Sequence, residues 1–121
     1  MSESHELGRK GEDLAGTHLR DKGFRILFRN WRWGGHEIDI IAENKDCIVF
    51  VEVKTRSENF MVSPGDAVPK SKQKAIIMAA DGYIQSYKID KESRFDIITI
   101  IRKNKDFEID HIENAFYPTL R

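Results

Sequence analysis

Hydrophobic side chains recur at spacings of three and four residues in two segments of the chain, which predicts two amphipathic helices. The first segment covers residues 4–22, and Lys22-Gly23 at its end is a typical helix stop. The second segment covers residues 70–88 and carries an apolar stripe made up of Ile76, Ala79, Ala80, Tyr83 and Tyr87.

Segments rich in β-branched and aromatic residues predict five strands, over residues 24–33, 37–43, 47–56, 94–102 and 107–116. Short turns separate the first three, so we expect these strands to be antiparallel neighbours. The segment at 57–69 is predicted to be a loop. The second helix is long enough for a crossover that makes the fourth strand parallel to a neighbour. The order αβββαββ predicts an α/β protein with a mixed central sheet flanked by helices.

Composition narrows the class of protein. A chain of 121 residues has the usual size of one domain, so we predict a single domain over residues 1–121. Basic and acidic residues number 20 each, which excludes a globally basic DNA-coating protein but allows local basic patches. No segment approaches the ~20 apolar residues of a membrane span, and the N-terminus lacks the pattern of a secretory signal. With Cys47 as the only cysteine, we expect a cytoplasmic protein that has no membrane partner.

Acidic residues gather on the predicted hairpin formed by the second and third strands. Side chains alternate along a strand, so Glu37 and Asp39 share one face, as do Glu52 and Lys54. A two-residue turn would place Glu37 opposite Glu52, whereas a four-residue turn would place Asp39 opposite Glu52. Both registers bring the four side chains to one face at one end of the hairpin. The opposite face is apolar and must be covered, most simply by a helix; it comprises Ile38, Ile40, Ala42, Val49, Val51 and Val53.

Three carboxylates crowded on one sheet face repel one another unless something neutralises them. A hard divalent cation such as Mg²⁺ prefers carboxylate oxygens and would relieve the repulsion. The alternative is an ordinary solvated sheet face on which Lys54 forms a salt bridge. That alternative does not explain why the apolar Ile48 and Phe50 share the face. A metal or catalytic site is therefore favoured.

Basic residues follow this hairpin in the sequence. Lys70, Lys72 and Lys74 crowd the first turn of the second helix, where cations oppose the helix dipole. A phosphate bound at that helix end would interact favourably with both the lysines and the helix dipole. These lysines are therefore candidate contacts to nucleic-acid phosphate, and so is Arg56, which follows Lys54 on the same strand face. The alternative is that the lysines only increase solubility.

A second basic segment interleaves arginine with tryptophan, as surfaces that bind single strands often do. It comprises Arg25, Arg29, Trp31, Arg32 and Trp33. Tryptophans in such a segment more often cap the edge of a core, and we favour that interpretation here.

An acid on one strand, followed by Glu-x-Lys on the next within an αβββαβ order, resembles the PD-(D/E)xK nuclease superfamily, and in particular its Holliday-junction-resolvase-like branch. The fuller pattern is similar to the YraN-like bacterial family of uncharacterised proteins and spans about residues 7 to 118. The matching segments are Gly11-Glu12, residues 37–42, residues 50–56, Ala67-Val68, Lys72, Arg94-Phe95-Asp96 and Asn114-Ala115-Phe116. The resemblance implies a restriction-endonuclease-like core.

The resemblance also implies roles for four residues. Asp39 and Glu52 match the metal-binding acids of the superfamily, and Lys54 matches its lysine. Glu12 matches the acid that the resolvase branch carries on its first helix. Glu12 would complete the metal shell either directly or through water.

Two further residues have open roles. Glu37 either supports the metal-binding acids or is a surface acid. Some branches of the superfamily carry a Gln-x-x-x-Tyr motif on the following helix. Here Gln73 is followed by Ile77, so the motif is incomplete, and whether Gln73 supports the site is left open.

The activity implied by the resemblance is hydrolysis of DNA phosphodiester bonds, with Mg²⁺ or Mn²⁺ as cofactor. The resemblance also allows selectivity for DNA structure and action as a homodimer. Because one fold can host different functions, the alternative is a catalytically inactive nucleic-acid-binding or assembly module. The intact acids and lysine favour the enzyme. A structural interaction protein with a solvated acidic face is a third hypothesis.

Overall fold

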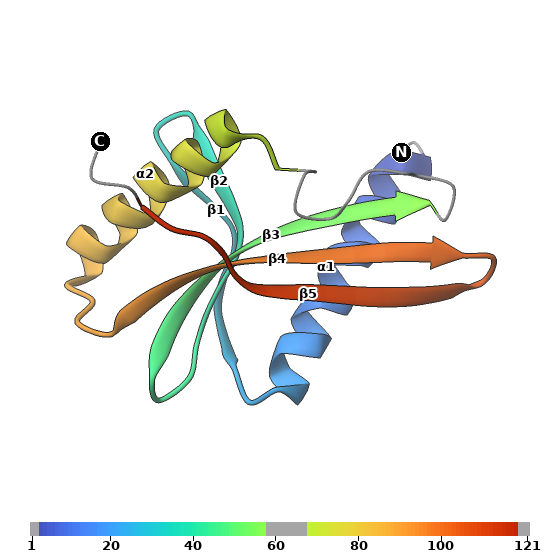
Figure 1. Cartoon of the computed structure of the whole chain (residues 1–121), viewed down its shortest axis with the longest axis horizontal. Coiled ribbons are helices and arrows are strands. Elements are labelled where there is room, and N and C mark those ends of the chain that lie inside the picture. The colour runs from blue at the N-terminus through green and yellow to red at the C-terminus, as the bar shows by residue number, and fades with distance from the viewer. Residues whose placement is uncertain (1–2, 58–67, 119–121) are drawn as a thin grey trace.

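Two helices lie on opposite faces of a five-stranded sheet (Figure 1). The computed structural model describes residues 3–57 and 68–118. Its elements are α1 (Glu3–Asp21), β1 (Arg25–Trp33), β2 (His36–Glu43), β3 (Cys47–Ser57), α2 (Lys70–Tyr87), β4 (Glu92–Lys103) and β5 (Asp106–Phe116). The predicted order αβββαββ is confirmed, and with it the α/β class and the restriction-endonuclease-like core. Most of the predicted loop at 57–69 lies outside the described residues.

The strands follow one another across the sheet in the order β1-β2-β3-β4-β5. All neighbours are antiparallel except β3 and β4, which are parallel. The chain leaves the end of β3 and returns through α2 to begin β4 beside the start of β3, so Cys47 pairs with Glu92. The predicted crossover is therefore confirmed.

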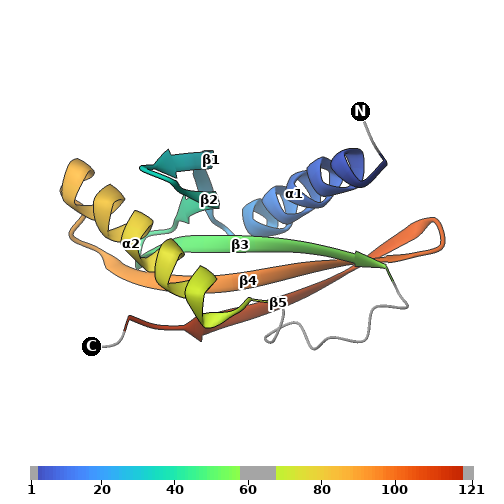
Figure 2. The same ribbon diagram turned by 90° about the horizontal axis from the view of Figure 1, so that it is seen from above.

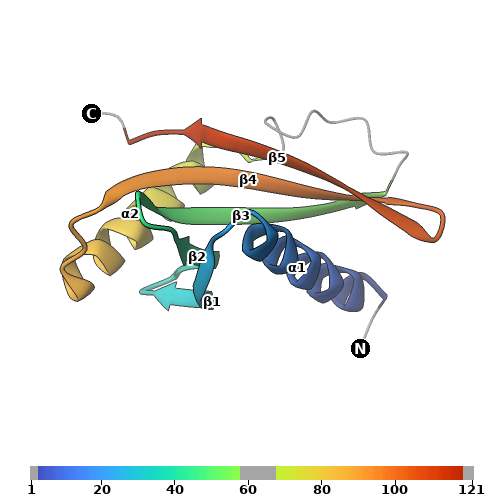
Figure 3. The same ribbon diagram turned by 90° about the horizontal axis from the view of Figure 1, so that it is seen from below.

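Each face of the sheet carries its own apolar core. Under α1, the buried Ala15 and Leu19 pack on Ile40, Val49 and Ile98. Under α2, the helix stripe packs on the other face; its buried members are Ile76, Ala79, Ala80 and Tyr83. Figures 2 and 3 show the two helices on opposite sides of the sheet. Neither helix in the described part of the chain combines the length and apolar character needed to cross a membrane.

One predicted face assignment is wrong. Ile38 was expected to share a face with Ile40, but it is buried in the α2 core, whereas Ile40 is buried in the α1 core. Strict alternation of faces requires continuous, regular pairing, and the pairing of β2 with β3 runs only from Glu43 to Ile40. On the N-terminal side of Ile40, β2 leaves β3, so the alternation of faces counted along the hairpin does not apply to Ile38.

The β2–β3 hairpin has the register that a four-residue turn produces. Glu43 pairs with Ile48 and Ile40 with Val51. Asn44 explains the longer turn, because its Oδ1 accepts hydrogen bonds from the backbone N–H groups of Asp46 and Cys47, each at 2.9 Å. Continued by one position, this register places Asp39 opposite Glu52, at the point where the two strands separate. We call this point the fork; Figure 1 shows β2 turning away from β3 there, with α1 behind.

A buried polar network holds the C-terminal half of α1 to the sheet. His18 on α1 lies 3.0 Å from His111 on β5, whose Nε2 lies 2.7 Å from the fully buried Asp96. Arg94 donates two hydrogen bonds to the same carboxylate. Burial acts to raise the pKa of Asp96, but hydrogen bonds from His111 and Arg94 outweigh it and lower the pKa below its usual value. This end of α1 is therefore fixed, and its other end meets the fork.

Candidate active site

Asp39 occupies the fork because β2 departs from β3 there. Its Oδ2 accepts a hydrogen bond of 2.8 Å from the backbone N–H of Val53. The N–H and C=O of one strand residue project to the same edge, so the Val53 carbonyl faces this side of β3 as well. The side chain of Asp39 thus takes the place of a neighbouring strand at the open edge of β3.

Glu52 is the second acid at the fork, and only 3% of its surface is exposed. A carboxylate buried this deeply requires positive partners. Lys54 Nζ lies 3.2 Å from Glu52 Oε2, and Lys72 Nζ from α2 lies 3.7 Å from the same oxygen. The Lys72 contact was not foreseen, because the sequence indicated only a phosphate-binding role for that lysine.

The two acids are too close for both to be charged without compensation. Burial, followed by the negative charge of Glu52, raises the pKa of Asp39 to about 8. A hydrogen bond with Glu52 and the charge of Glu12 act in the same direction, whereas the Val53 N–H acts against them. Glu52 has its two lysines, whereas Asp39 holds a proton at neutral pH unless a bound metal ion takes the proton's place. Two oxygen ligands and a nearby backbone carbonyl suit a hard divalent cation.

Helix α1 reaches the fork through a close approach at Gly11. A Cβ at that position would overlap Thr55 Oγ1 on β3, so this approach requires a glycine. At Gly8, in contrast, a Cβ would meet nothing within 4 Å. Gly11, and not Gly8, is therefore the glycine that lets α1 approach β3 closely.

Glu12, the residue after Gly11, turns its carboxylate toward β1. Its Oε1 lies 3.4 Å from Arg29 Nη2, and Arg29 also binds Asp13 at 2.7 Å. Among the side chains described in residues 6–57 and 68–118, no three His, Cys, Asp or Glu residues are grouped to hold a metal ion. Glu12 lies close enough to Asp39 for its charge to act on that carboxyl, while its own carboxylate contacts Arg29, and its expected role, direct or through water, stays a prediction.

A solvent-open cavity of about 380 Å³ lies at the fork. The four predicted catalytic residues and one predicted phosphate contact line it: Glu12, Asp39, Glu52, Lys54 and Arg56. Two acids, two cations and a helix-borne acid thus surround one space that a small charged group can enter.

Other predicted residues lie outside this cavity. Glu37 forms an ion pair of 3.0 Å with Arg32 across the β1–β2 hairpin. The side chain of Gln73 donates to the backbone carbonyl of Val68 at 3.0 Å and so helps to hold the start of α2. Lys70 and Lys74 are exposed on the first turns of α2, next to Lys72; that first turn has no acidic residue and no side-chain cap.

The arginines of β1 are engaged with neighbouring acids. Arg25 pairs with Glu43, Arg29 with the two acids of α1, and Arg32 with Glu37. Trp31 packs edge-on against the buried Tyr83 at 5.2 Å between ring centroids. The contact supports the interpretation that Trp31 caps a core edge, whereas Trp33 is 40% exposed.

Comparison with known proteins shows the family to which this chain belongs. Residues 11–100 match the profile of the uncharacterised protein family UPF0102. Two UPF0102 proteins, from Parabacteroides distasonis and Bacteroides thetaiotaomicron, are 47% and 48% identical to the chain, with 99–100% of both chains covered. A third, from Chlorobium phaeobacteroides, is 45% identical, and the match covers 93% of this chain and 94% of the relative. The predicted YraN-like family is confirmed.

Among solved structures, the Ca²⁺ complex of SfsA from Pyrococcus furiosus aligns with 91% of this chain and 63% of its own. The TM-score is 0.35 and the sequence identity 15%, so this likeness carries no argument about the site.

Proposed function

The chain belongs to the uncharacterised protein family UPF0102, and from the geometry of the fork we propose that it is a metal-dependent nuclease that hydrolyses DNA phosphodiester bonds. The observation that carries the proposal is the meeting of Asp39, Glu52 and Lys54 at one solvent-open cavity. Crowded acids with a raised pKa beside a lysine are typical of sites that act on charged substrates.

The acids are proposed to hold Mg²⁺ or Mn²⁺, with the Val53 carbonyl as a further oxygen ligand. Asp39 is held in place by the Val53 N–H, and Glu52 by two lysines, so both carboxylates are oriented before a cation binds. When bound, such a cation supplies a polarised phosphoryl oxygen and a bound water of lowered pKa. Binding also removes the need for a proton on Asp39, so cation affinity rises with pH.

Lys54 is proposed to orient the attacking water and to offset negative charge that develops on the phosphate. Its Nζ lies within ion-pair distance of Glu52 and its side chain is only 22% exposed, so the ammonium is already positioned and partly desolvated. Preorganised charge of this kind stabilises a transition state without reorganisation at the moment of reaction.

The lysines of α2 and Arg56 are proposed to hold the DNA backbone on either side of the scissile phosphate. Lys72 joins the fork to α2. Lys70 and Lys74, four residues apart, lie together on another side of the first turns of α2 and are exposed to solvent. Arg56 lines the cavity itself. We assign the enzyme to the cytoplasm and allow for action as a homodimer on a branched substrate.

The test is cleavage of labelled linear, flapped and four-way DNA by the full chain with Mg²⁺, with Mn²⁺ and with EDTA. We expect metal-dependent cutting that Asp39→Asn and Glu52→Gln abolish. Glu37→Gln is the matched control, because it removes an acid of β2 outside the cavity and should leave cutting intact. Cutting that survives in both fork variants would refute the assignment. Tight, metal-independent DNA binding without any cutting would show an inactive binding module instead.

A further inference from the structure

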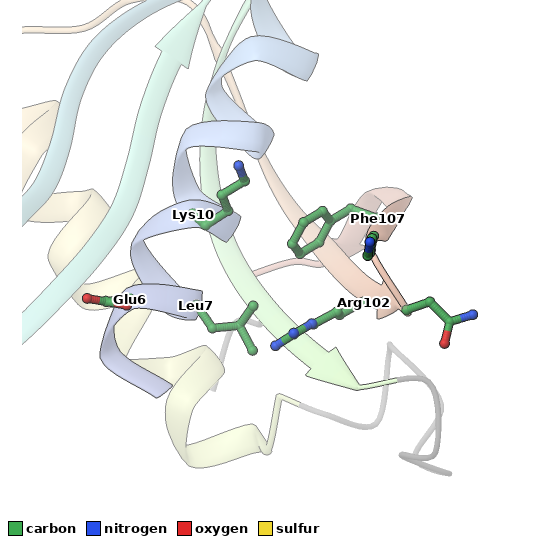
Figure 4. A pocket seen from close by; sticks show the side chains of 7 residues that line it. Glu6, Leu7, Lys10, Arg102 and Phe107 are labelled. Carbon is green, nitrogen blue, oxygen red and sulfur yellow. The ribbon is translucent and has the colours of Figure 1, made fainter. Parts of the chain in front are cut away.

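A second cavity, of about 460 Å³, lies on the other flank of α1, between this helix and the β4–β5 hairpin. It is shown in Figure 4. We call it the hairpin cavity; it is lined by Glu6, Leu7, Lys10, Arg102, Lys105 and Phe107, together with Asn104. The predicted active site uses none of these residues.

The two strands present an arginine and an aromatic ring to this cavity from one sheet face. Arg102 on β4 pairs directly with Phe107 on β5, and directly opposed residues of antiparallel strands point to the same side. Phe107 packs at the margin of the α1 core and remains partly exposed. Lys10 of α1 places its Nζ 5.9 Å from the centre of the Phe107 ring, within the range of a cation–π contact.

The cations of the hairpin cavity are not neutralised by neighbouring acids. Among the described residues, Lys10, Arg102 and Lys105 form no ion pair, whereas each arginine of β1 does. The one acid of the lining is Glu6, and Figure 4 shows its carboxylate pointing away from Phe107 and Arg102. Three cationic side chains therefore line one cavity together with an aromatic ring, which is a site for an anion that also carries an aromatic group.

The hairpin cavity adjoins the cavity at the fork. Leu7 lines both, and Gly8 and Glu12 face the fork while Lys10 faces the hairpin. A polymer that leaves the fork over the first turns of α1 therefore enters the hairpin cavity next.

We propose that the hairpin cavity binds an unpaired nucleotide of the substrate, with its base on Phe107 and its phosphates at Arg102, Lys105 and Lys10. That the polymer is DNA rests on the proposed function. The hairpin cavity adds to it that the substrate contains a single-stranded segment. Aromatic stacking requires a base that has left the double helix, because paired bases keep their faces inside the stack. Cations grouped around an aromatic side chain are the combination by which proteins hold single strands.

The test is binding of a labelled oligothymidylate to the full chain in EDTA, followed by fluorescence anisotropy at several salt concentrations. Phe107→Leu keeps an apolar side chain and should weaken binding about fivefold or more, with an unchanged salt slope. Arg102→Gln combined with Lys105→Gln should weaken binding on the order of tenfold at about 0.1 M salt and reduce the log–log salt slope by about 1.4. The matched control is Arg20→Gln combined with Lys45→Gln, which removes the same two charge types from exposed positions that do not line this cavity and should change neither quantity.

Because the assay contains no metal and requires no cutting, its outcome is independent of whether the chain hydrolyses DNA. Loss of binding in both cavity variants, with unchanged melting temperatures, supports the proposal even if the wild-type chain never cuts. Binding that matches the control in both variants overturns it, even if the fork proves catalytic. Binding of duplex DNA alone, with no affinity for the oligothymidylate, also overturns it.

Discussion

Replacing Asp39 with asparagine should stabilise the metal-free protein, and increasingly so as the pH rises. Burial and Glu52 raise the pKa of Asp39 from 3.8 to about 8 in the folded state. The folded protein therefore binds more protons than the unfolded chain between about pH 4 and pH 8. Because of this difference, the contribution of Asp39 to the free energy of unfolding is largest below pH 4 and falls as the pH rises through that window.

The size of the effect follows from the same pKa. A tenfold change in proton concentration corresponds to about 1.4 kcal/mol, so the interval from pH 5 to pH 8 sets an upper limit of about 4 kcal/mol for this carboxyl. Water entry and relaxation reduce such penalties, and we expect about 2 kcal/mol. The asparagine amide resembles the protonated carboxyl, since its oxygen can accept from the Val53 N–H while its NH₂ donates to Glu52.

Urea unfolding in EDTA, followed by tryptophan fluorescence at pH 5 and pH 8, measures this effect. The stability advantage of Asp39→Asn over the wild-type protein should grow between the two pH values. Glu37→Gln is the control; it loses only a partly exposed ion pair, for which about 0–1 kcal/mol and no growth with pH are expected. Added Mg²⁺ should stabilise the wild-type protein at pH 8 and not Asp39→Asn. An advantage that shrinks toward pH 8 would refute the reasoning.

Three further results are expected. Lys54→Gln should abolish cutting yet retain the rise in melting temperature on adding Mg²⁺, because the lysine acts on the reaction and not as a ligand; loss of both effects would contradict that division of roles. Gly11→Ala should destabilise the protein by about 1 kcal/mol or more through the overlap with Thr55, whereas Gly8→Ala should stabilise it by about 0.5–1 kcal/mol. Equal effects of the two substitutions in urea unfolding would show that α1 does not approach β3 closely. Asp96→Asn should cost about 3 kcal/mol at pH 7, because it breaks a buried ion pair. The lowered pKa of Asp96 means that this stabilisation exists above about pH 4 and is lost as the pH falls through the folded-state value, so the cost should shrink in acid unfolding.

Sequence patterns were sufficient to predict the helices, the strands and the way the strands are connected. Hydrophobic periodicity located both helices, and short turns together with one long crossover fixed which strands are antiparallel and which are parallel. Asp39 and Glu52 were expected close together in either register, and they line one cavity, whereas Glu37, expected on the same face, pairs with Arg32 outside it. The choice between registers depended on the side chain of Asn44, whose Oδ1 accepts hydrogen bonds from backbone N–H groups within the turn.

The remaining features depend on where strands separate and on contacts between distant elements. Alternation failed at Ile38 because β2 leaves β3 next to it. The contact of Lys72 with Glu52 requires the docking angle of α2, which periodicity does not give. The network of His18, His111 and Asp96 joins α1 to the β4–β5 hairpin, and His18 lies 93 residues before His111, so no local pattern could indicate it.

The position of a bound Mn²⁺ ion tests the central claim most directly. Crystals of the full chain grown above pH 8 and soaked in MnCl₂ can be measured at a wavelength at which manganese scatters anomalously. The account predicts one anomalous peak at the fork, within coordination distance of both Asp39 and Glu52. Manganese bound elsewhere, with these two carboxylates in contact but without the ion, would contradict it.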